Sequence, residues 1–506
     1  MESKSTATLI VALGAALYIL FPGLILLPYL PPLQDFNGQD VLWALQNTIL
    51  QSTLGGLGSI FLGGLGSLFL LRWSPEAWPS RLIQLALLTP SFLPPLFLIL
   101  ALLELIDPFP MGNIGLVIAH IFANAGVVSV LLARYTFSHL VHQAETAHLI
   151  GASRAMIVRR ILWPQWKKPL AGLFFLVFVS AFTTFSLPLV LGGGKGTTLE
   201  VLIYERIRID GDWTQAFWIS VIQSSLFLLL IPLFRISAPM RSPAQPLPLK
   251  FLWSAWAGVF CLPSASLLAS YICLLFESLQ TVSVWPISAS ASIKLSLMSL
   301  LIGGTVGIFL LMALSFLGFC VLRFSSLSYF LRRLLAPSQA FVGLALILIF
   351  DSDAIGFWLA LSVGLTYLFL PTMAKMNLIE NAEQIRSLFI EGRRMGASSF
   401  QIFWGITLPL MWPSLCLLAA LGSIWAAGDF ALQKVVAVET FTLSQEIEGF
   451  LSTYRLHQAG ALSLLWLFLL AMLFWLFTGV IHVVGQKLIQ VLWRFSSPNT
   501  RTRAPR

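Results

Sequence analysis

Charged residues are scarce in this chain. Of its 506 residues only 10% are Asp, Glu, Lys or Arg, while 58% are hydrophobic and the mean hydropathy is +0.87. A soluble domain carries about 25% charged residues, so the composition excludes a soluble protein and indicates an integral membrane protein. The net charge of +9 suggests nucleic acid or an acidic membrane surface, but the placement of the basic residues described below favours the membrane, and we expect no nucleic-acid partner.

The sequence also has few of the residue patterns that form disulfide frameworks, metal sites, catalytic nucleophiles or nucleotide-binding loops. The 4 cysteines lie in apolar runs, which gives no disulfide framework, and no cluster of His, Cys and carboxylates has metal-ligand spacing. No nucleophile motif such as G-x-S-x-G is present. In the glycine-rich stretch 191–198, Gly196 follows Lys195, where a P-loop has Ser or Thr. We therefore expect no enzyme activity, no cofactor in this chain and no ATP site of its own.

Long apolar runs fall into two sets of six. Because about 20 apolar residues span a bilayer, they predict an all-α polytopic membrane protein with about twelve transmembrane helices. The runs lie near 7–27, 47–71, 82–106, 114–134, 169–191 and 214–236, and then near 251–276, 293–320, 334–350, 354–374, 412–432 and 461–485. The expected division is a helix and outer loop (1–42), a first transmembrane domain (43–236), a linker with the first helix of the second half (237–288), a second transmembrane domain (289–486) and a basic cytoplasmic tail (487–506).

Basic residues indicate the orientation of the chain. With a cytoplasmic N-terminus and twelve alternating spans, most of the 30 Lys and Arg fall on the cytoplasmic side, as the positive-inside rule requires. Most of the acidic residues then fall outside. We therefore expect both termini in the cytoplasm.

Two polar islands interrupt the apolar pattern and are copies of one another. The first island runs from Glu145 to Pro164 and the second from Ile390 to Pro409, each on the cytoplasmic side before the fifth span of its half. The matching residues, all at one constant offset, are Gly151-Ala152-Ser153 with Gly396-Ala397-Ser398, Ile161 with Ile406 and Pro164 with Pro409. The same order of spans in both halves indicates a parallel repeat.

Each island predicts a helix, a tight turn and a second helix. The glycine can take the left-handed conformation that ends a helix, the serine can cap the next helix, and the proline is expected to stop it. The alternative is a surface hairpin without a partner. Two copies at matched spacing, each ahead of a membrane span, favour a docking element.

The repeated pattern resembles the cytoplasmic signature of type-1 ABC importer permeases, which reads E-A-A, three residues, G-A-S and then I-x-L-P. The first copy keeps Glu145 and Ala147. In the second copy Ile390 stands in the place of the glutamate, with Glu391 one position later and Gly392 at the second alanine. The resemblance implies that both islands are coupling loops that dock on ATP-hydrolysing subunits.

The same resemblance implies the partners and the location. It describes a bacterial inner-membrane permease with two fused domains, surrounded by lipid, that works with two ABC ATPase subunits and an extracytoplasmic substrate-binding protein. ATP is then bound by the partner subunit. Asp429, which is followed by Phe430 near the outer exit of its expected span, resembles a pathway or gate residue of the family.

The cargo is indicated only by resemblance. The stretch 191–204, which reads L-G-G-G-K-G-T-T-L-E-V-L-I-Y, is similar to the fused permeases of thiamine and iron(III) importers. It favours thiamine, with iron(III) second and polyamine or phosphonate behind. The alternative class is a secondary transporter driven by an ion gradient, which usually needs ionisable residues inside its spans; Asp429 is the carboxylate placed well inside one.

Overall fold

The protein is all-helical. The structure, a computed structural model, describes residues 14, 17–29, 38–230, 249, 255–350, 354–436 and 440–496, and within these ranges it contains helices and turns but no strand. This confirms the expected fold class. The beginning of the expected linker segment, residues 237–254 apart from Leu249, and the end of the expected basic tail lie outside the described residues.

The first half builds a series of helices around the first island. A short helix over Leu17–Leu26 and η1 (Leu27–Tyr29) come before it. The series is α2 (Gly38–Leu70), α3 (Trp78–Phe92), α4 (Pro95–Leu105), α5 (Asn113–His139), α6 (Val141–Leu149), α7 (Arg154–Ile157), η2 (Val158–Leu162), α8 (Trp163–Phe182), α9 (Ser186–Leu191), α10 (Leu199–Arg208) and α11 (Trp213–Leu230).

The second half repeats this order around the second island. Its elements are η5 (Ala255–Cys261), α12 (Leu262–Thr281), α13 (Ala289–Arg323), α14 (Ser325–Arg333), α15 (Gln339–Ile349), α16 (Ala354–Met373), η6 (Ala374–Leu378), α17 (Ile379–Arg394), α18 (Ser399–Ile402), η7 (Phe403–Thr407), α19 (Leu408–Gly428), α20 (Ala431–Val436), α21 (Leu443–Ser452), α22 (Leu456–Trp475), η8 (Leu476–Ile481) and α23 (His482–Ser496).

Fewer of the described helices are long and apolar enough to span a membrane than the twelve that the sequence predicts. Seven are long and apolar enough to cross a membrane, and α3 with α4 counts as an eighth, although the pair is bent by 106°. The run 82–106 breaks at Pro94 and Pro95, because proline cannot donate to the helix. The run 334–350 is shortened to α15, 11 residues long. The run 7–27 lies partly outside the described residues.

The two halves are copies in their bonding as well as in their order. At the start of α10, the Leu199 N–H donates to Thr48 Oγ on α2 over 3.0 Å. At the start of α21, the Leu443 N–H donates to Ser299 Oγ on α13, also over 3.0 Å. The first residue of α10 and the first residue of α21 are therefore hydrogen-bonded to equivalent hydroxyl groups on the longest helix of each half.

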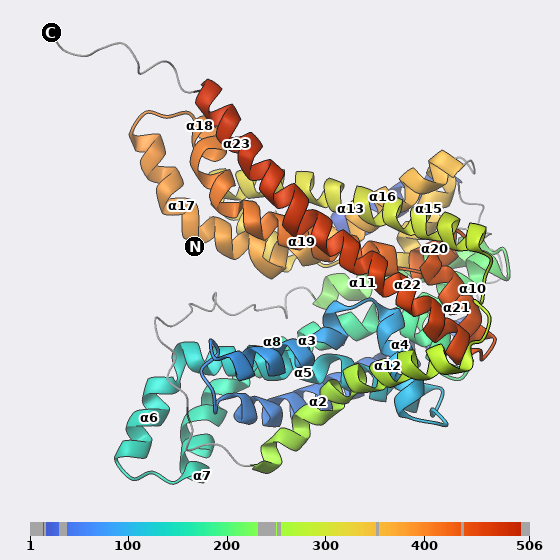
Figure 1. Cartoon of the computed structure of the whole chain (residues 1–506), viewed down its shortest axis with the longest axis horizontal. Helices are drawn as coiled ribbons and strands as arrows, with labels where there is room; N and C mark the ends of the chain where they lie inside the picture. The colour runs from blue at the N-terminus through green and yellow to red at the C-terminus, as the bar shows by residue number, and fades with distance from the viewer. Residues whose placement is uncertain are drawn as a thin grey trace.

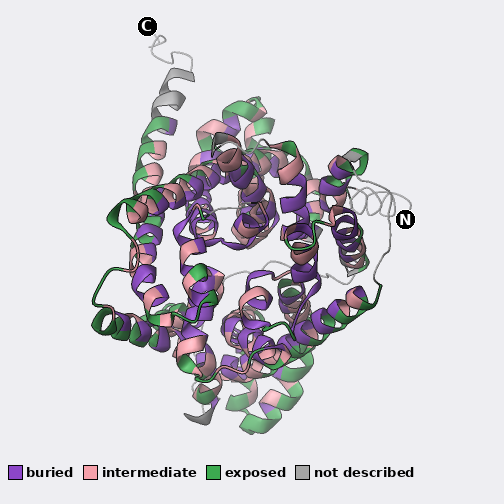
Figure 2. Ribbon diagram, turned by 90° about the vertical axis from the view of Figure 1, so that its right-hand side faces the viewer, coloured by how far each residue is buried: buried purple, intermediate pink, exposed green. Residues whose placement is uncertain are grey.

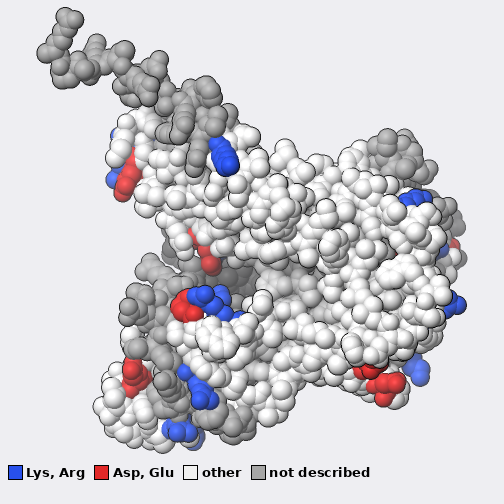
Figure 3. Space-filling view, in the orientation of Figure 1, with Lys and Arg blue, Asp and Glu red and all other residues white. Residues whose placement is uncertain are grey.

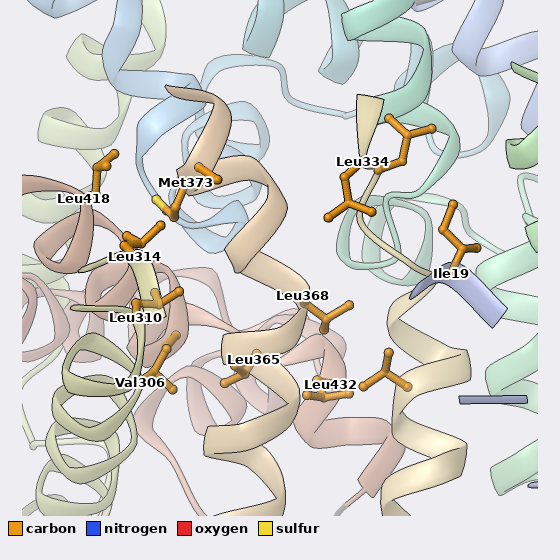
Figure 4. Close-up of a cluster of buried hydrophobic side chains, with 14 of the residues drawn as sticks. Ile19, Val306, Leu310, Leu314, Leu334, Leu365, Leu368, Met373, Leu418 and Leu432 are labelled. Carbon is orange, nitrogen blue, oxygen red and sulfur yellow. The ribbon is translucent and has the colours of Figure 1, made fainter. Parts of the chain in front are cut away.

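The first helix of each half packs against the other half. Ile19 lies against the second half beside Leu334 (Figure 4), and the rings of Tyr18 and Tyr367 stack with centroids 4.4 Å apart. In return α12 packs on α3, α4 and α5 of the first half, where Ser270 Oγ donates to the Ala101 carbonyl over 2.9 Å. The chain position of α12 suggests the second half, but it packs largely on the first.

The islands lie together at one end of the molecule. Figure 1 shows α6, α7, α17 and α18 at the left, and α10, α20 and α21 at the opposite end, which we call the outer end. Buried residues gather on the inward sides of the helices and exposed ones at the periphery (Figure 2). In Figure 3 the charged side chains lie mainly toward the two ends, the band between them is largely uncharged, and a hollow separates the two halves on the island side.

Because the islands and the outer loop lie at opposite ends of the molecule, we expect a membrane-impermeant reagent to reach them from opposite sides of the membrane. Met395, in the second island, is 85% exposed, and Lys195, in the outer loop, is also exposed. In a background without native cysteines, Met395→Cys is expected to react with an impermeant thiol reagent only from the cytoplasmic side, and Lys195→Cys only from the outside. Labelling of both from one side would contradict the arrangement.

Candidate functional site

The turns of the two islands have the same backbone geometry. The φ angle is +89° at Gly151 and +90° at Gly396, so the left-handed conformation expected from the sequence is confirmed at both. The Ala152 N–H donates to the Ala147 carbonyl and the Gly151 N–H to the His148 carbonyl, each over 3.0 Å. This pair of bonds is a Schellman motif, which satisfies the last carbonyls of α6.

The second island repeats the Schellman motif at equivalent positions. There the Ala397 N–H donates to the Gly392 carbonyl over 3.2 Å, and the Gly396 N–H donates to the Arg393 carbonyl over 3.1 Å. The identical bonding shows that the departures of this copy from the sequence pattern leave the shape of the turn unchanged.

The serine after each turn caps the next helix, as expected. Ser153 Oγ accepts from the Met156 N–H over 3.3 Å, and Ser398 Oγ accepts from the Gln401 N–H over 3.2 Å. In the second island the Gln401 side chain also accepts from the Ser398 N–H, which completes a capping box. Because two donors are satisfied instead of one, the second cap is the better one.

The prediction that a proline stops each second helix was wrong. Pro164 and Pro409 lie in the first turn of α8 and α19, and each helix runs on beyond its proline. The turns before them, η2 and η7, are π-helical. A proline has no N–H to give and crowds the carbonyl four residues back, and the wider π-turn accommodates it without ending the helix. Each island is therefore continuous with a long helix.

A small apolar base supports each turn. Ile157 is fully buried in the first island, and its equivalent Ile402 is 2% exposed in the second. A Cβ on Gly392 would lie 3.0 Å from Ile402 Cδ1, which gives a physical reason why the second copy has glycine where the first has Ala147. Ala147, Ala152 and Ile161 pack partly buried on the first base, and Ala397 on the second.

The acidic residues expected to help docking differ between the copies. Glu145 is half-buried, whereas Glu391 is exposed. Ile390, which occupies the position equivalent to Glu145, is 44% exposed, and Ile406 is 38% exposed. The second island therefore presents more apolar surface than the first at these positions.

Sequence reasoning missed the apolar tips of both turns. Leu149 and Ile150 are 79% and 81% exposed, and Met395 and Phe400 are 85% and 66% exposed. A contiguous exposed apolar surface is typical of interaction sites, so a docking role for these residues is a prediction. The pattern that could have revealed them is an apolar residue directly before the turn glycine in an otherwise polar segment.

Asp429 lies at a helix junction and not inside a span. It follows the last residue of α19, is 5% exposed, and its Oδ2 accepts from the Leu432 N–H over 3.0 Å at the start of α20. Its Oδ1 accepts from Gln339 Nε2 over 3.4 Å. These bonds give the carboxylate a structural position at the outer end of α19, and its role at a gate stays a prediction.

Comparison with known proteins identifies the first half. Residues 55–239 match the family model described as a binding-protein-dependent transport system inner membrane component. This stretch contains the first island and the helices on both sides of it. Residues 55–239 therefore form a type-1 ABC permease domain. No solved structure matches the chain.

The chain also has curated relatives. The thiamine transport system permease protein of Brucella abortus is 38% identical over 133 residues, 26% of this chain and 24% of the relative. Those of Haemophilus influenzae and Escherichia coli are 31% identical over 123 residues and 30% over 139 residues, covering 24% and 27% of this chain and 23% and 26% of the relatives. The match thus spans about a quarter of the length of these relatives.

The cap of the second turn can be tested by hydrogen exchange. Ser398→Ala removes the acceptor of the Gln401 N–H, and loss of such a cap costs about 1 kcal/mol. Amide exchange around Gln401 is therefore expected to be about fivefold faster, by mass spectrometry of the purified permease. Ser399→Ala is the matched control, because Ser399 Oγ bonds Arg393 and caps nothing. Equal exchange in the two variants would contradict the role of the cap.

Proposed function

We propose that this protein is the permease subunit of a binding-protein-dependent ABC importer. Its two halves form the pathway, each island docks on a separate ATPase subunit, and a binding protein delivers cargo at the outer end. The family match of residues 55–239 supports the class. The observation that carries the proposal for the whole chain is the second island, which reproduces the turn of the first bond for bond.

The geometry suits a mechanical connection between ATPase and pathway. Each exposed tip is fixed to a capped turn, the turn leads through a π-helical turn into α8 or α19, and that helix runs to the outer end. At the far end of α19, Trp425 Nε1 donates to the Phe92 carbonyl of the first half over 2.7 Å. A displacement of the turn is thus carried to the contact between the halves, where packed interfaces switch between discrete arrangements.

Thiamine is the proposed cargo. Relatives named thiamine transport system permease proteins match the chain at 29–38% identity, and iron(III) is kept as a second cargo to be tested beside it.

The protein should be co-reconstituted in proteoliposomes with its ATPase and a thiamine-loaded binding protein. We expect ATP-dependent uptake of labelled thiamine, with no uptake from ATP-free vesicles that carry a proton or sodium gradient. Gradient-driven uptake would support the secondary transporter instead.

Valine at the turn glycines should uncouple the permease from the ATPase. A Cβ added at Gly151 or Gly396 would meet no other atom within 4 Å, so the cost of a side chain is backbone strain, roughly 1–2 kcal/mol and more for a β-branched residue. Gly151→Val and Gly396→Val are expected to insert normally but to retain less ATPase in a pull-down and to transport little. The second copy is expected to be the more tolerant.

The matched control for these variants is Gly172→Val. Gly172 also has open space around it but lies in α8 without a positive φ, so an added Cβ meets neither backbone strain nor a close contact. We expect wild-type ATPase retention and uptake for this control. Full uptake by the Gly151→Val, Gly396→Val double variant would show that the islands are not the coupling elements.

A further inference from the structure

A buried carboxylate connects the two halves at the outer end. Glu200, in the first turn of α10, is fully buried. Its Oε1 accepts from Gln223 Nε2 of α11 over 2.8 Å. Its Oε2 accepts from Ser338 Oγ over 3.0 Å and from the Ala340 N–H over 3.2 Å. Three donors thus surround a carboxylate that is fully buried.

Two of these donors belong to the other half of the chain. Glu200 and Gln223 lie on α10 and α11 of the first half, whereas Ser338 and Ala340 form the start of α15 in the second half. The first-turn amides of a helix point outward without partners and carry a partial positive charge. The carboxylate of one half therefore accepts from a buried first-turn amide of the other half, an interaction that is strong when the acid is ionised.

The other buried acids at the outer end differ from Glu200 in this respect. Glu448 pairs with Lys434 of its own half over 2.7 Å, and Asp429 bonds residues of its own half. Among these acids, Glu200 is therefore the one whose hydrogen bonds cross the contact between the halves. A neighbouring bond from Arg208 Nε to the Val435 carbonyl, 2.6 Å long, crosses the same contact.

The contact is made while the opposite end is open. Figure 3 shows the hollow between the halves on the island side, and Figure 1 shows α10 and α15 packed together at the outer end. We propose that Glu200 is the latch of the outer end: its bonds to Ser338 and Ala340 keep the two halves together there while the island side is open. The inference rests on the proposed function, because a latch matters only if the halves separate to pass cargo.

A carboxylate suits this task because its bonds can be exchanged for water. When the halves separate, α15 leaves and Glu200 becomes hydrated, so the charge is compensated in both arrangements. Loss of the carboxylate removes the acceptor from the closed arrangement alone. The equilibrium then moves toward an open outer end, by about tenfold or more if each hydrogen bond to a charge contributes as is usual.

The test measures distances in the purified permease alone. Spin labels at Ile209 and Ile349, both exposed, report the separation of α10 and α15, and labels at Leu149 and Met395 report the islands. In lipid nanodiscs, Glu200→Ala is expected to increase the population with a long outer distance about tenfold and to shorten the island distance. Glu200→Gln keeps an acceptor oxygen and should lie between Glu200→Ala and the wild type.

The controls separate a latch from a local packing effect. Ser338→Ala removes one donor of the other half, so a smaller shift in the same direction is expected even if Glu200→Ala fails to fold. Glu446→Gln, in the first turn of the corresponding helix α21, should leave both distances unchanged. Unchanged distances in Glu200→Gln and Ser338→Ala, or a changed outer distance with unchanged islands, would overturn the proposal. No cargo or ATPase is present, so failure of thiamine uptake would not affect this result.

Discussion

Backbone groups inside a bilayer must find their partners within the protein, and this constraint is most demanding where a helix breaks. The bend between α3 and α4 leaves the Phe92 carbonyl to be satisfied by Trp425 of the other half. The start of α15 receives the Glu200 carboxylate, again from the other half. The broken helices are thus completed by their opposite halves, which makes the contact at the outer end specific.

The islands satisfy the same constraint in another way at the other end of the molecule. A Schellman motif closes α6 and α17, and a serine opens the next helix. Because these terminal groups are satisfied locally, the turns need no support from the other half and can carry exposed apolar tips. The two halves are therefore hydrogen-bonded to each other at the outer end, whereas the turns at the island end are closed by hydrogen bonds within each island and can contact other proteins.

The sequence could predict those features that depend on near neighbours. The positive φ at Gly151 and Gly396 and the serine caps follow from residues within one turn, and the repeat follows from the matching residues of the two islands and the order of the apolar runs. The continuation of α8 through Pro164 could not be predicted, because it depends on a π-turn. The role of Glu200 was hidden for another reason: its partners on α15 lie far away along the chain.

The exchange of first helices also has a consequence for how the chain is made. The surface of α3, α4 and α5 on which α12 packs belongs to helices that leave the ribosome well before residues 262–281. Until that later segment is inserted, the surface lacks its α12 partner, and hydrogen bonds such as that from Ser270 to Ala101 cannot form. The first half can therefore complete its packing only after α12 of the second half has been made. A nascent chain cut between the two halves would leave an incompletely packed domain in the membrane.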